Sequence, residues 1–158
     1  MKEKFKNLPF RKGVGIIVLN KYNKIFVARR IDNSRNFWQM PQGGVDENED
    51  FLSAAYRELE EETSIKKVKL IKEIDEMTTY ELPNDLLGII WKGRFKGQKQ
   101  KWFLMRYLGD DEEININTNK PEFLDWKWID LDMITEVVVH FKLEVYKILQ
   151  KKIKMIIN

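Results

Sequence analysis

The most informative segment of the sequence is Gly43-Gly-Val-Asp-Glu-Asn-Glu-Asp-Phe-Leu-Ser-Ala-Ala-Tyr-Arg-Glu-Leu-Glu-Glu-Glu-Thr-Ser-Ile65. Two glycines open it, so the backbone can approach its neighbours closely there. From Glu49 to Thr63, four apolar residues recur at the spacing of one helix face, namely Phe51, Leu52, Ala55 and Leu59. This pattern predicts a helix over residues 49–63 that packs its apolar stripe against a sheet.

The same helix carries a concentrated set of acids. At about 100° per residue, Glu58, Glu61 and Glu62 fall within an arc of roughly 100°, whereas Glu60 points away from them. Like charges on one helix face repel each other and cost helix stability. A hard divalent cation removes this cost, because it prefers oxygen ligands and bridges carboxylates to phosphates. The alternative is an acidic face exposed to solvent, which is the commoner meaning of a charge run.

The composition limits the chemistry that is available. The chain has 158 residues, no cysteine and one histidine, His140. Disulfides, thiolate metal sites, cysteine nucleophiles and multi-histidine metal sites are therefore excluded. No run of residues approaches the length of a membrane span, and the first residues lack the apolar core of a secretory signal. We therefore expect a cytoplasmic protein without a membrane partner.

Charge is distributed unevenly along the chain. Residues 46–62 contain eight acids and one base, a net charge of −7, so the other residues together carry +10 of the total of +3. Residues 86–109 contain six bases and no acid. An anionic site within a cationic remainder suits an enzyme that holds metal ions and attracts a polyanionic substrate.

The remaining segments predict a mixed α/β fold. Residues 13–19 and 24–30 read as a hairpin, and residues 38–44 read as a loop broken by Pro41 and two glycines. Further strands are predicted over residues 68–77, 102–108 and 123–129. A short helix is predicted over 131–137 and a longer one over 141–153. Strands that enclose a central helix, with more helix at the end, indicate a sandwich.

The spacing of the opening stretch resembles the Nudix box, G-x5-E-x7-R-E-U-x-E-E-x-G-U, where U is a bulky apolar residue. Gly43, Glu49 and the run that begins at Arg57 match it, and Leu59 and Ile65 fill both U positions. Ser64 replaces the glycine that ends the helix in the family. Because that glycine takes a left-handed backbone most easily, the departure leaves the exit of the helix open.

The resemblance implies a single domain over residues 1–158 with an α/β/α sandwich, a mixed β-sheet and the Nudix loop-helix-loop. It implies divalent metal ligands at Glu58, Glu61 and Glu62, and a metal-activated water that attacks a phosphoanhydride. Mg²⁺ is the expected metal, with Mn²⁺ or Zn²⁺ as alternatives. We expect Glu58, or else Glu61, to accept the proton of the water, and Arg57 to orient the carboxylates by charge-assisted hydrogen bonds.

Motifs outside the box resemble the bacterial RNA pyrophosphohydrolases, also described as (di)nucleoside polyphosphate hydrolases. They are Trp38-Gln-Met-Pro-Gln-Gly-Gly44, Gly97-Gln-Lys-Gln-Lys-Trp-Phe103 and Pro121-Glu-Phe-x-x-Trp-x-Trp128. In this group Glu122 matches a fourth metal carboxylate, although it could also be a surface acid. The same resemblance, together with the charges, suggests these substrate-binding residues: Arg11, Arg30, Gln42, Gly43, Gly44, Tyr80, Lys99, Lys101, Phe141 and Lys142. Tyr80 and Phe141 could equally be packing residues.

We therefore expect an enzyme that removes pyrophosphate from the 5′ end of triphosphorylated or diphosphorylated RNA, with a role in mRNA decay. The first alternative is a hydrolase of dinucleoside polyphosphates such as diadenosine tetraphosphate. The second is a non-catalytic RNA-binding module, because the basic stretch from Lys92 to Arg106 is interleaved with aromatic residues. We expect a monomer; the sequence leaves any protein activator open.

Overall fold

The computed structural model describes residues 3–32 and 35–158. Its strands form one seven-stranded sheet: β1 (Phe10–Leu19), β2 (Ile25–Arg30), β3 (Gln42–Gly44), β4 (Val68–Glu73), β5 (Thr78–Glu81), β6 (Gly97–Tyr107) and β7 (Phe123–Ile129). The helices are α1 (Phe51–Thr63), α2 (Ile134–Val137) and α3 (Leu143–Ile157). Short 3₁₀ turns lie at Glu3–Phe5, Ile90–Gly93, Asp111–Glu113, Leu131–Met133 and His140–Lys142. Residues 1–2 and 33–34 of the expected domain lie outside the described residues.

The sheet is mixed. Its main order is β4-β6-β1-β2-β7, with β3 paired to β1 and β5 paired to β6. The pairing of β1 with β6 is parallel and the other pairings are antiparallel. The expected hairpin of β1 and β2 is confirmed. None of the described helices is long and apolar enough to cross a bilayer.

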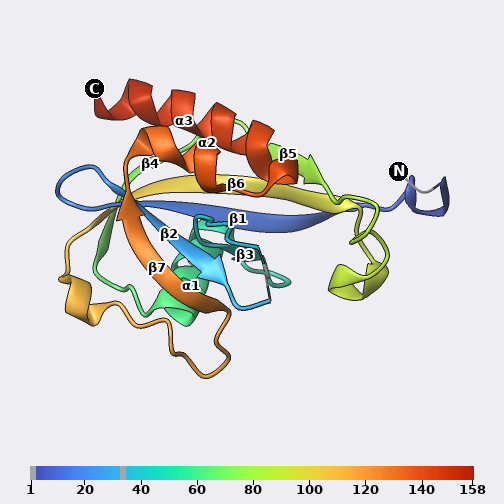
Figure 1. Ribbon diagram of the computed structural model, residues 1–158, viewed down its shortest axis with the longest axis horizontal. Coiled ribbons are helices and arrows are strands. Elements are labelled where there is room, and N and C mark those ends of the chain that lie inside the picture. Colours follow the sequence, from blue (N-terminus) through green and yellow to red (C-terminus); the bar gives the residue numbers. More distant parts are fainter. Residues whose placement is uncertain (1–2, 33–34) are drawn as a thin grey trace.

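Helices cover both faces of the sheet, as Figure 1 shows, which confirms the predicted sandwich. On one face Ala54, Ala55 and Leu59 of α1 pack on the even-numbered residues of β1, such as Ile16 and Val18. On the other face α3 packs Val145, Tyr146, Leu149 and Ile153 on the odd-numbered residues of β1. Successive side chains of a strand point to opposite faces of the sheet, so β1 is buried on both faces. Helices α1 and α3 therefore lie on opposite sides of β1.

Two predictions about strands were wrong. Residues 38–44 are not all loop, because Gln42–Gly44 pairs with β1 in the register Gly13↔Gly44 and Gly15↔Gln42. The glycines of both strands leave room for neighbouring side chains, because Cβ atoms at Gly13, Gly43 and Gly44 would overlap Gln98, Glu58 and Arg11. The predicted strand 68–77 is too long, because β4 ends at Glu73 and a bend follows in which Glu76 has a φ of 64°. Strand β5 (Thr78–Glu81) begins after that range and was not predicted. Strand β6 also begins at residue 97, five residues earlier than predicted.

The helix boundaries also differ from the predictions. Helix α1 begins at Phe51, because the Asp50 side chain caps it by accepting a 2.7 Å hydrogen bond from the Ser53 N–H. Glu49 therefore precedes the helix and is not in its first turn. The predicted helix 141–153 begins at Leu143, after a 3₁₀ turn, and continues to Ile157. The predicted helix 131–137 divides into a 3₁₀ turn and α2.

Candidate active site

Helix α1 is the element that positions the acidic side chains. Its buried stripe fixes its rotation on the sheet, and Asp50 fixes its start. At its end, Ser64 takes the left-handed conformation, with φ 65°, and its N–H bonds the Glu60 carbonyl. The departure from glycine is accommodated because the Ser64 hydroxyl donates a 2.8 Å hydrogen bond to the Asn115 carbonyl. The helix exit that the sequence left open is thus a normal left-handed cap.

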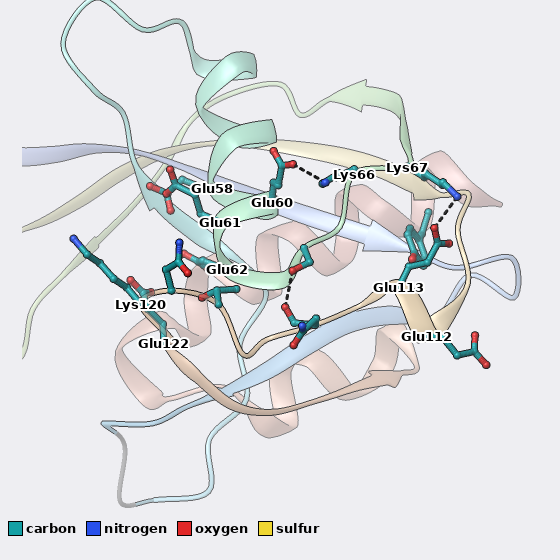
Figure 2. A pocket seen from close by; sticks show the side chains of 15 residues that line it. Glu58, Glu60, Glu61, Glu62, Lys66, Lys67, Glu112, Glu113, Lys120 and Glu122 are labelled. Carbon is teal, nitrogen blue, oxygen red and sulfur yellow. Dashed lines mark hydrogen bonds and ion pairs between the residues drawn. The ribbon is translucent and has the colours of Figure 1, made fainter.

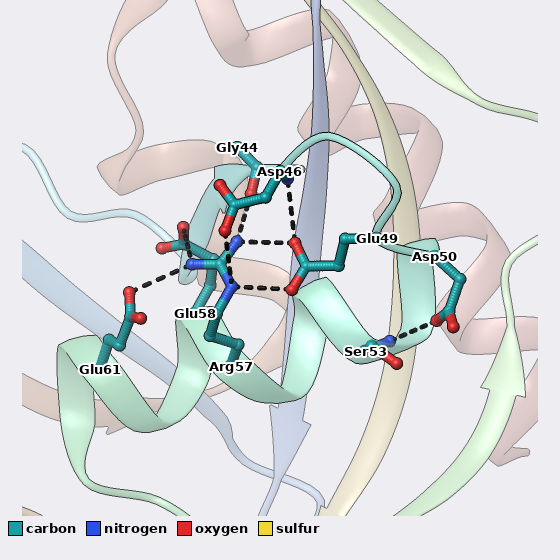
Figure 3. A network of polar contacts seen from close by, with 8 residues as sticks. All are labelled: Gly44, Asp46, Glu49, Asp50, Ser53, Arg57, Glu58 and Glu61. Atoms are coloured by element: carbon teal, nitrogen blue, oxygen red, sulfur yellow. Dashed lines mark hydrogen bonds and ion pairs between the residues drawn. The ribbon is translucent and has the colours of Figure 1, made fainter.

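Arg57 is the centre of a polar network that Figure 3 shows. Its Nε and Nη2 donate to the two oxygens of Glu49 at 2.8 and 2.9 Å. Nη2 also donates to the Gly44 carbonyl at 2.9 Å. Nη1 donates to Glu58 at 3.0 Å and to Glu61 at 3.2 Å. One guanidinium therefore connects Gly44, the segment before α1 and two of the helix carboxylates. The hydrogen bonds to the carboxylates are those expected for Arg57.

The ionisation of this network follows from its hydrogen bonds. The Arg57 guanidinium and the Asp46 N–H lower the pKa of Glu49 to about 2. The pKa of Arg57 is raised, first by its bond to Glu49 and also by Glu58. Charge-assisted, two-pronged bonds of this kind hold a side chain in one orientation. Arg57 is therefore a fixed cation beside the acidic helix face.

The Glu58 side chain lies against Gly43 of strand β3. A Cβ at Gly43 would overlap the Glu58 carboxylate, so only glycine leaves room for this side chain. Burial raises the pKa of Glu58, although its bond to Arg57 acts in the opposite direction. The carboxylate is thus held by a cation on one side and backbone on the other, in a partly desolvated place.

Glu62 is the most deeply buried acid of α1, with 5% of its surface exposed. Burial raises its pKa well above the usual value, and the charges of Glu122 and Glu58 raise it further. Within the described part of the chain, its Oε2 is buried and has no hydrogen-bond partner. Burying a carboxylate oxygen without a partner costs free energy, and binding a cation or a proton at this atom would remove that cost.

A pocket of about 1040 Å³ opens over these acids. Figure 2 shows Glu58, Glu61 and Glu62 reaching it from α1 and Glu122 from the segment before β7. Glu60 stands at its edge and pairs with Lys66 at 3.5 Å. The sequence-predicted carboxylates are therefore brought to one pocket from two elements.

These carboxylates fit a hard divalent cation. Oxygen-only donors from several elements, with one buried oxygen lacking a donor, match the preference of Mg²⁺-type ions. Among residues 3–32 and 35–158 no three acids already converge on one point, so a cation would draw these side chains together. The Nudix family uses divalent metals, and the donor chemistry here agrees with that.

A second group of polar residues lies next to Gly43, on the α3 face of the sheet. The Tyr80 hydroxyl donates to Gln98 at 3.0 Å and accepts from Gln42 at 3.4 Å. Gln98 also donates to the Gly43 carbonyl at 3.3 Å, and Gln100 donates to Gln42 at 3.1 Å. These hydrogen bonds connect Tyr80 to Gly43 of strand β3, against which the Glu58 side chain lies.

Lys142 and Phe141 both contact the Tyr80 ring. The Phe141 ring lies 5.8 Å from the Tyr80 ring, centroid to centroid. The Lys142 amine lies over the Tyr80 ring at 5.4 Å and donates to Gln39 at 3.3 Å. Burial, and then the charge of Arg30, lowers the pKa of Lys142 to about 7. A buried amine beside two rings could meet an anionic or aromatic ligand.

The two predicted arginines contact different parts of the site: Arg30 lies beside Glu122 and Arg11 lies beside Gly44. Arg30 forms a double hydrogen bond with Asp32, at 2.8 and 2.9 Å, and lies 3.8 Å from Glu122. The pKa of Arg30 is raised, chiefly by its bond to Asp32. Arg11 lies where a Cβ on Gly44 would be, and it stacks on Trp91 at 5.2 Å.

Lys99 and Lys101 do not lie with the polar group of Tyr80, Gln98 and Gln100. On β6 they alternate with Gln98 and Gln100, so they face the α1 side of the sheet. Lys101 pairs with Glu73 at 3.2 Å. Their substrate-binding role stays a prediction.

Three residues of the site were missed by the sequence reasoning: Gln39, Gln98 and Gln100. Two of them lie in Gly97-Gln-Lys-Gln-Lys-Trp-Phe103, where the two-residue alternation of a strand would have placed both glutamines on one face. No local pattern marks Gln39, because its role depends on a contact with Lys142. Trp91 was expected only as an aromatic residue beside the basic stretch, and its contact with Arg11 was not predicted.

Comparison with known proteins identifies the family. The NUDIX domain matches residues 9–149. An RNA pyrophosphohydrolase of Pelagibacter ubique is 68% identical over 152 residues, 96% of each chain. An RNA pyrophosphohydrolase of Rhodospirillum rubrum is 48% identical over 140 residues, 89% of this chain and 84% of that one. The E. coli dihydroneopterin triphosphate pyrophosphohydrolase structure has the same fold, with a TM-score of 0.71 at 19% identity, over 92% of this chain and 99% of that one. The resemblance seen in the sequence is therefore confirmed, and this chain belongs to the NUDIX family as a Nudix hydrolase.

Proposed function

We propose that this protein hydrolyses the 5′ phosphate chain of RNA and releases pyrophosphate from triphosphorylated ends. The observation that carries this is the continuity between two groups of residues. Gln98 bonds both the Gly43 carbonyl, against which Glu58 packs, and Tyr80, beside which Phe141 and Lys142 lie. The acidic, metal-suited pocket is thus connected by hydrogen bonds to a group of aromatic and cationic side chains. The relatives named RNA pyrophosphohydrolases support the same substrate.

In this proposal Glu58, Glu61, Glu62 and Glu122 hold the divalent metal, with Mg²⁺ as the first candidate and Mn²⁺ or Zn²⁺ as alternatives. A bound metal supplies positive charge against the phosphates and makes a water molecule more acidic. The chain supplies the proton acceptor. Glu58 suits this role better than Glu61, because its carboxylate is partly desolvated and held by Arg57, whereas 58% of the Glu61 side chain is exposed.

The other residues bind and orient the substrate. Arg57 is a positioning residue that keeps Glu58 and Glu61 aimed at the pocket. Gly43 and Gly44 let a phosphate approach the backbone closely. Phe141 and the Arg30 guanidinium offer flat surfaces on which an unpaired base can stack, whereas Tyr80, with 6% of its surface exposed, supports Phe141 from the core. Arg11 and Lys142 supply positive charge for the phosphates and the leaving pyrophosphate.

Product analysis tests this proposal. With 5′-labelled triphosphorylated RNA and Mg²⁺, we expect labelled pyrophosphate and a monophosphorylated RNA. Glu61→Gln should abolish release while the circular dichroism spectrum and the melting temperature stay close to those of the wild type. Glu60→Gln, on the same helix and paired with Lys66 among the described residues, is the matched control and should retain activity. Normal turnover by Glu61→Gln under saturating Mg²⁺ would refute the assignment of α1.

A dinucleoside polyphosphate such as diadenosine tetraphosphate is the second candidate substrate, because the same chemistry applies and the Phe141 ring, which lies against Tyr80, could hold any base. Comparing kcat/KM on this compound and on triphosphorylated RNA separates the two. A non-catalytic RNA-binding module is the third candidate, and Mg²⁺-stimulated pyrophosphate release would eliminate it. We further propose that residues 1–158 act as one domain and as a monomer in the cytoplasm, where RNA decay takes place.

A further inference from the structure

The loop between β5 and β6, residues 82–96, has an unusual backbone. Trp91 and Lys92 both take left-handed conformations, with φ of 53° and 58°, and Gly93 follows with φ of 71°. Non-glycine residues rarely adopt this region, and the strain persists only where surrounding contacts impose it. Backbone strain of this kind is concentrated at functional sites, so this loop is a candidate for a functional site.

The loop is held firmly at its base. The Leu82 N–H donates to the Lys96 carbonyl at 2.8 Å, and the Lys96 N–H donates to the Pro9 carbonyl at 3.0 Å. Leu87 is buried in the core, with 1% of its surface exposed. Figure 1 shows the loop projecting, in yellow-green, from the end of the sheet where β1 begins. Its tip is therefore a fixed feature that faces solvent.

The tip combines cations and aromatic rings. Residues 86–96 contain three bases and no acid, although the exposed Asp85 comes just before them. Lys92 and Arg94 are exposed, and neither side chain forms an ion pair or hydrogen bond within the described residues. The Trp91 and Phe95 rings meet edge to face, 6.2 Å apart. Unpaired cations beside half-buried rings match the chemistry of single-stranded nucleic acid.

Arg11 connects this tip to the active site. Its guanidinium stacks on Trp91 at 5.2 Å and fills the space beside Gly44. The Gly44 carbonyl accepts a hydrogen bond from Arg57, which orients Glu58. Four contacts therefore connect Trp91 to Glu58, by way of Arg11, Gly44 and Arg57.

We propose that Trp91, Lys92, Arg94 and Phe95 form a platform that binds the RNA chain beyond its first nucleotides. Lys92 and Arg94 contact its phosphates, and the rings stack on its bases. This rests on the proposed function, in which the 5′ phosphates occupy the acidic pocket. The platform distinguishes RNA from a dinucleoside polyphosphate, because the latter has no chain beyond its two nucleosides to place there.

The test uses a double variant, Lys92→Gln with Arg94→Gln, and a control, Lys69→Gln with Lys151→Gln. The control changes the net charge equally on exposed residues of β4 and α3. Binding of a 5′-hydroxyl octanucleotide is measured by fluorescence anisotropy at several salt concentrations. We expect the platform variant to raise Kd about tenfold and to reduce the slope of log affinity against log salt by roughly 1.4, for two lost phosphate contacts. The control should match the wild type.

Turnover is measured in parallel on a triphosphorylated octanucleotide and a triphosphorylated dinucleotide with the same first bases. We expect kcat/KM of the platform variant to fall about tenfold on the octanucleotide and to stay within about twofold on the dinucleotide. Equal effects on both lengths, or unchanged octanucleotide binding, would overturn the platform. If the wild-type protein releases no pyrophosphate from either RNA but the platform variant still binds the octanucleotide more weakly, the proposed function fails and the platform stands.

Discussion

The Arg57 guanidinium and the Glu49 carboxylate face each other in a two-pronged pair, with N–O distances of 2.8 and 2.9 Å. Glu49 lies before α1 and Arg57 lies in its second turn, so the pair closes the loop onto the helix. The Asp46 N–H donates to the same carboxylate at 2.9 Å. The remaining Arg57 nitrogen holds Glu58 and Glu61. The loop and the carboxylates are therefore positioned by one side chain.

Arg57→Lys should lower kcat about 10- to 100-fold, which is the usual cost of losing a residue that orients metal ligands. Lysine keeps the charge, but its single amine cannot bond Glu49, Gly44 and Glu58 together. KM should change little, because Arg57 faces the carboxylates and not the base-stacking rings. Steady-state kinetics on triphosphorylated RNA measure this. Arg106→Lys, on β6 and bonded to Asn20 and Asn23, is the control and should keep its kcat.

An unchanged kcat for Arg57→Lys would contradict the positioning role. A fall in kcat together with a large fall in melting temperature would mean that Arg57 acts through stability, so thermal melts accompany the kinetics.

Glu49 should make the protein more sensitive to acid. Its pKa is lowered to about 2, below the usual value of 4.5, so its charged form stabilises the folded state. This contribution is complete above pH 4.5 and is lost as the pH falls towards about 2. Urea unfolding at a series of pH values from about 6 to about 2.5 should show the wild type losing stability more steeply than Glu49→Gln.

Glu47→Gln, on an exposed neighbour in the same loop, should follow the wild-type curve. Parallel curves for the wild type and Glu49→Gln would show that the pair with Arg57 contributes nothing to folding.

Local patterns predicted the parts of this site that lie within one element. The helix periodicity and the spacing of Glu58, Glu61 and Glu62 identified α1 and its acidic face, because helix geometry alone sets both. The start of α1 was predicted two residues early, although Asp50 before Phe51 is an ordinary capping signal. That small error hid the role of Glu49, which is free of the helix and can therefore turn back to Arg57.

The parts that depend on distant contacts were not predicted. Strand β3 depends on pairing with β1, a contact between segments far apart in the sequence, and Gly13 and Gly15 leave room for the side chains of Gln98 and Trp102 beside it. Lys99 and Lys101 were grouped with the substrate by their motif, but alternation on β6 turns them away from Gln98 and Gln100. The left-handed Trp91 and Lys92 follow no local preference at all, since their conformation is imposed by the packing of the loop.

Ser64 should tolerate glycine but not alanine. Its left-handed backbone costs about 1 kcal/mol for any residue with a Cβ. Its hydroxyl offsets this through the bond to the Asn115 carbonyl. Ser64→Ala keeps the strain and loses the bond, so the protein should lose about 1 kcal/mol and melt about 2–4 °C lower. Ser64→Gly loses both, and its melting temperature should stay near the wild type. If alanine and serine gave equal melting temperatures, the bond to Asn115 would have no energetic role.

Glu62→Gln should separate metal binding from folding. Without metal, the buried Glu62 carboxylate has an unpaired oxygen and faces Glu58 and Glu122, so replacing it with an amide removes repulsion. In EDTA the variant should therefore melt at the same temperature as the wild type or higher. Adding Mg²⁺ or Mn²⁺ at about a hundredfold excess over Kd stabilises a binding protein by roughly 2.7 kcal/mol, or about 5–10 °C for a chain of this size. We expect this rise in the wild type and in Glu60→Gln, and little of it in Glu62→Gln. A full rise in Glu62→Gln would place the cation elsewhere, because a neutral amide at the most buried position of the acidic face cannot replace the lost charge.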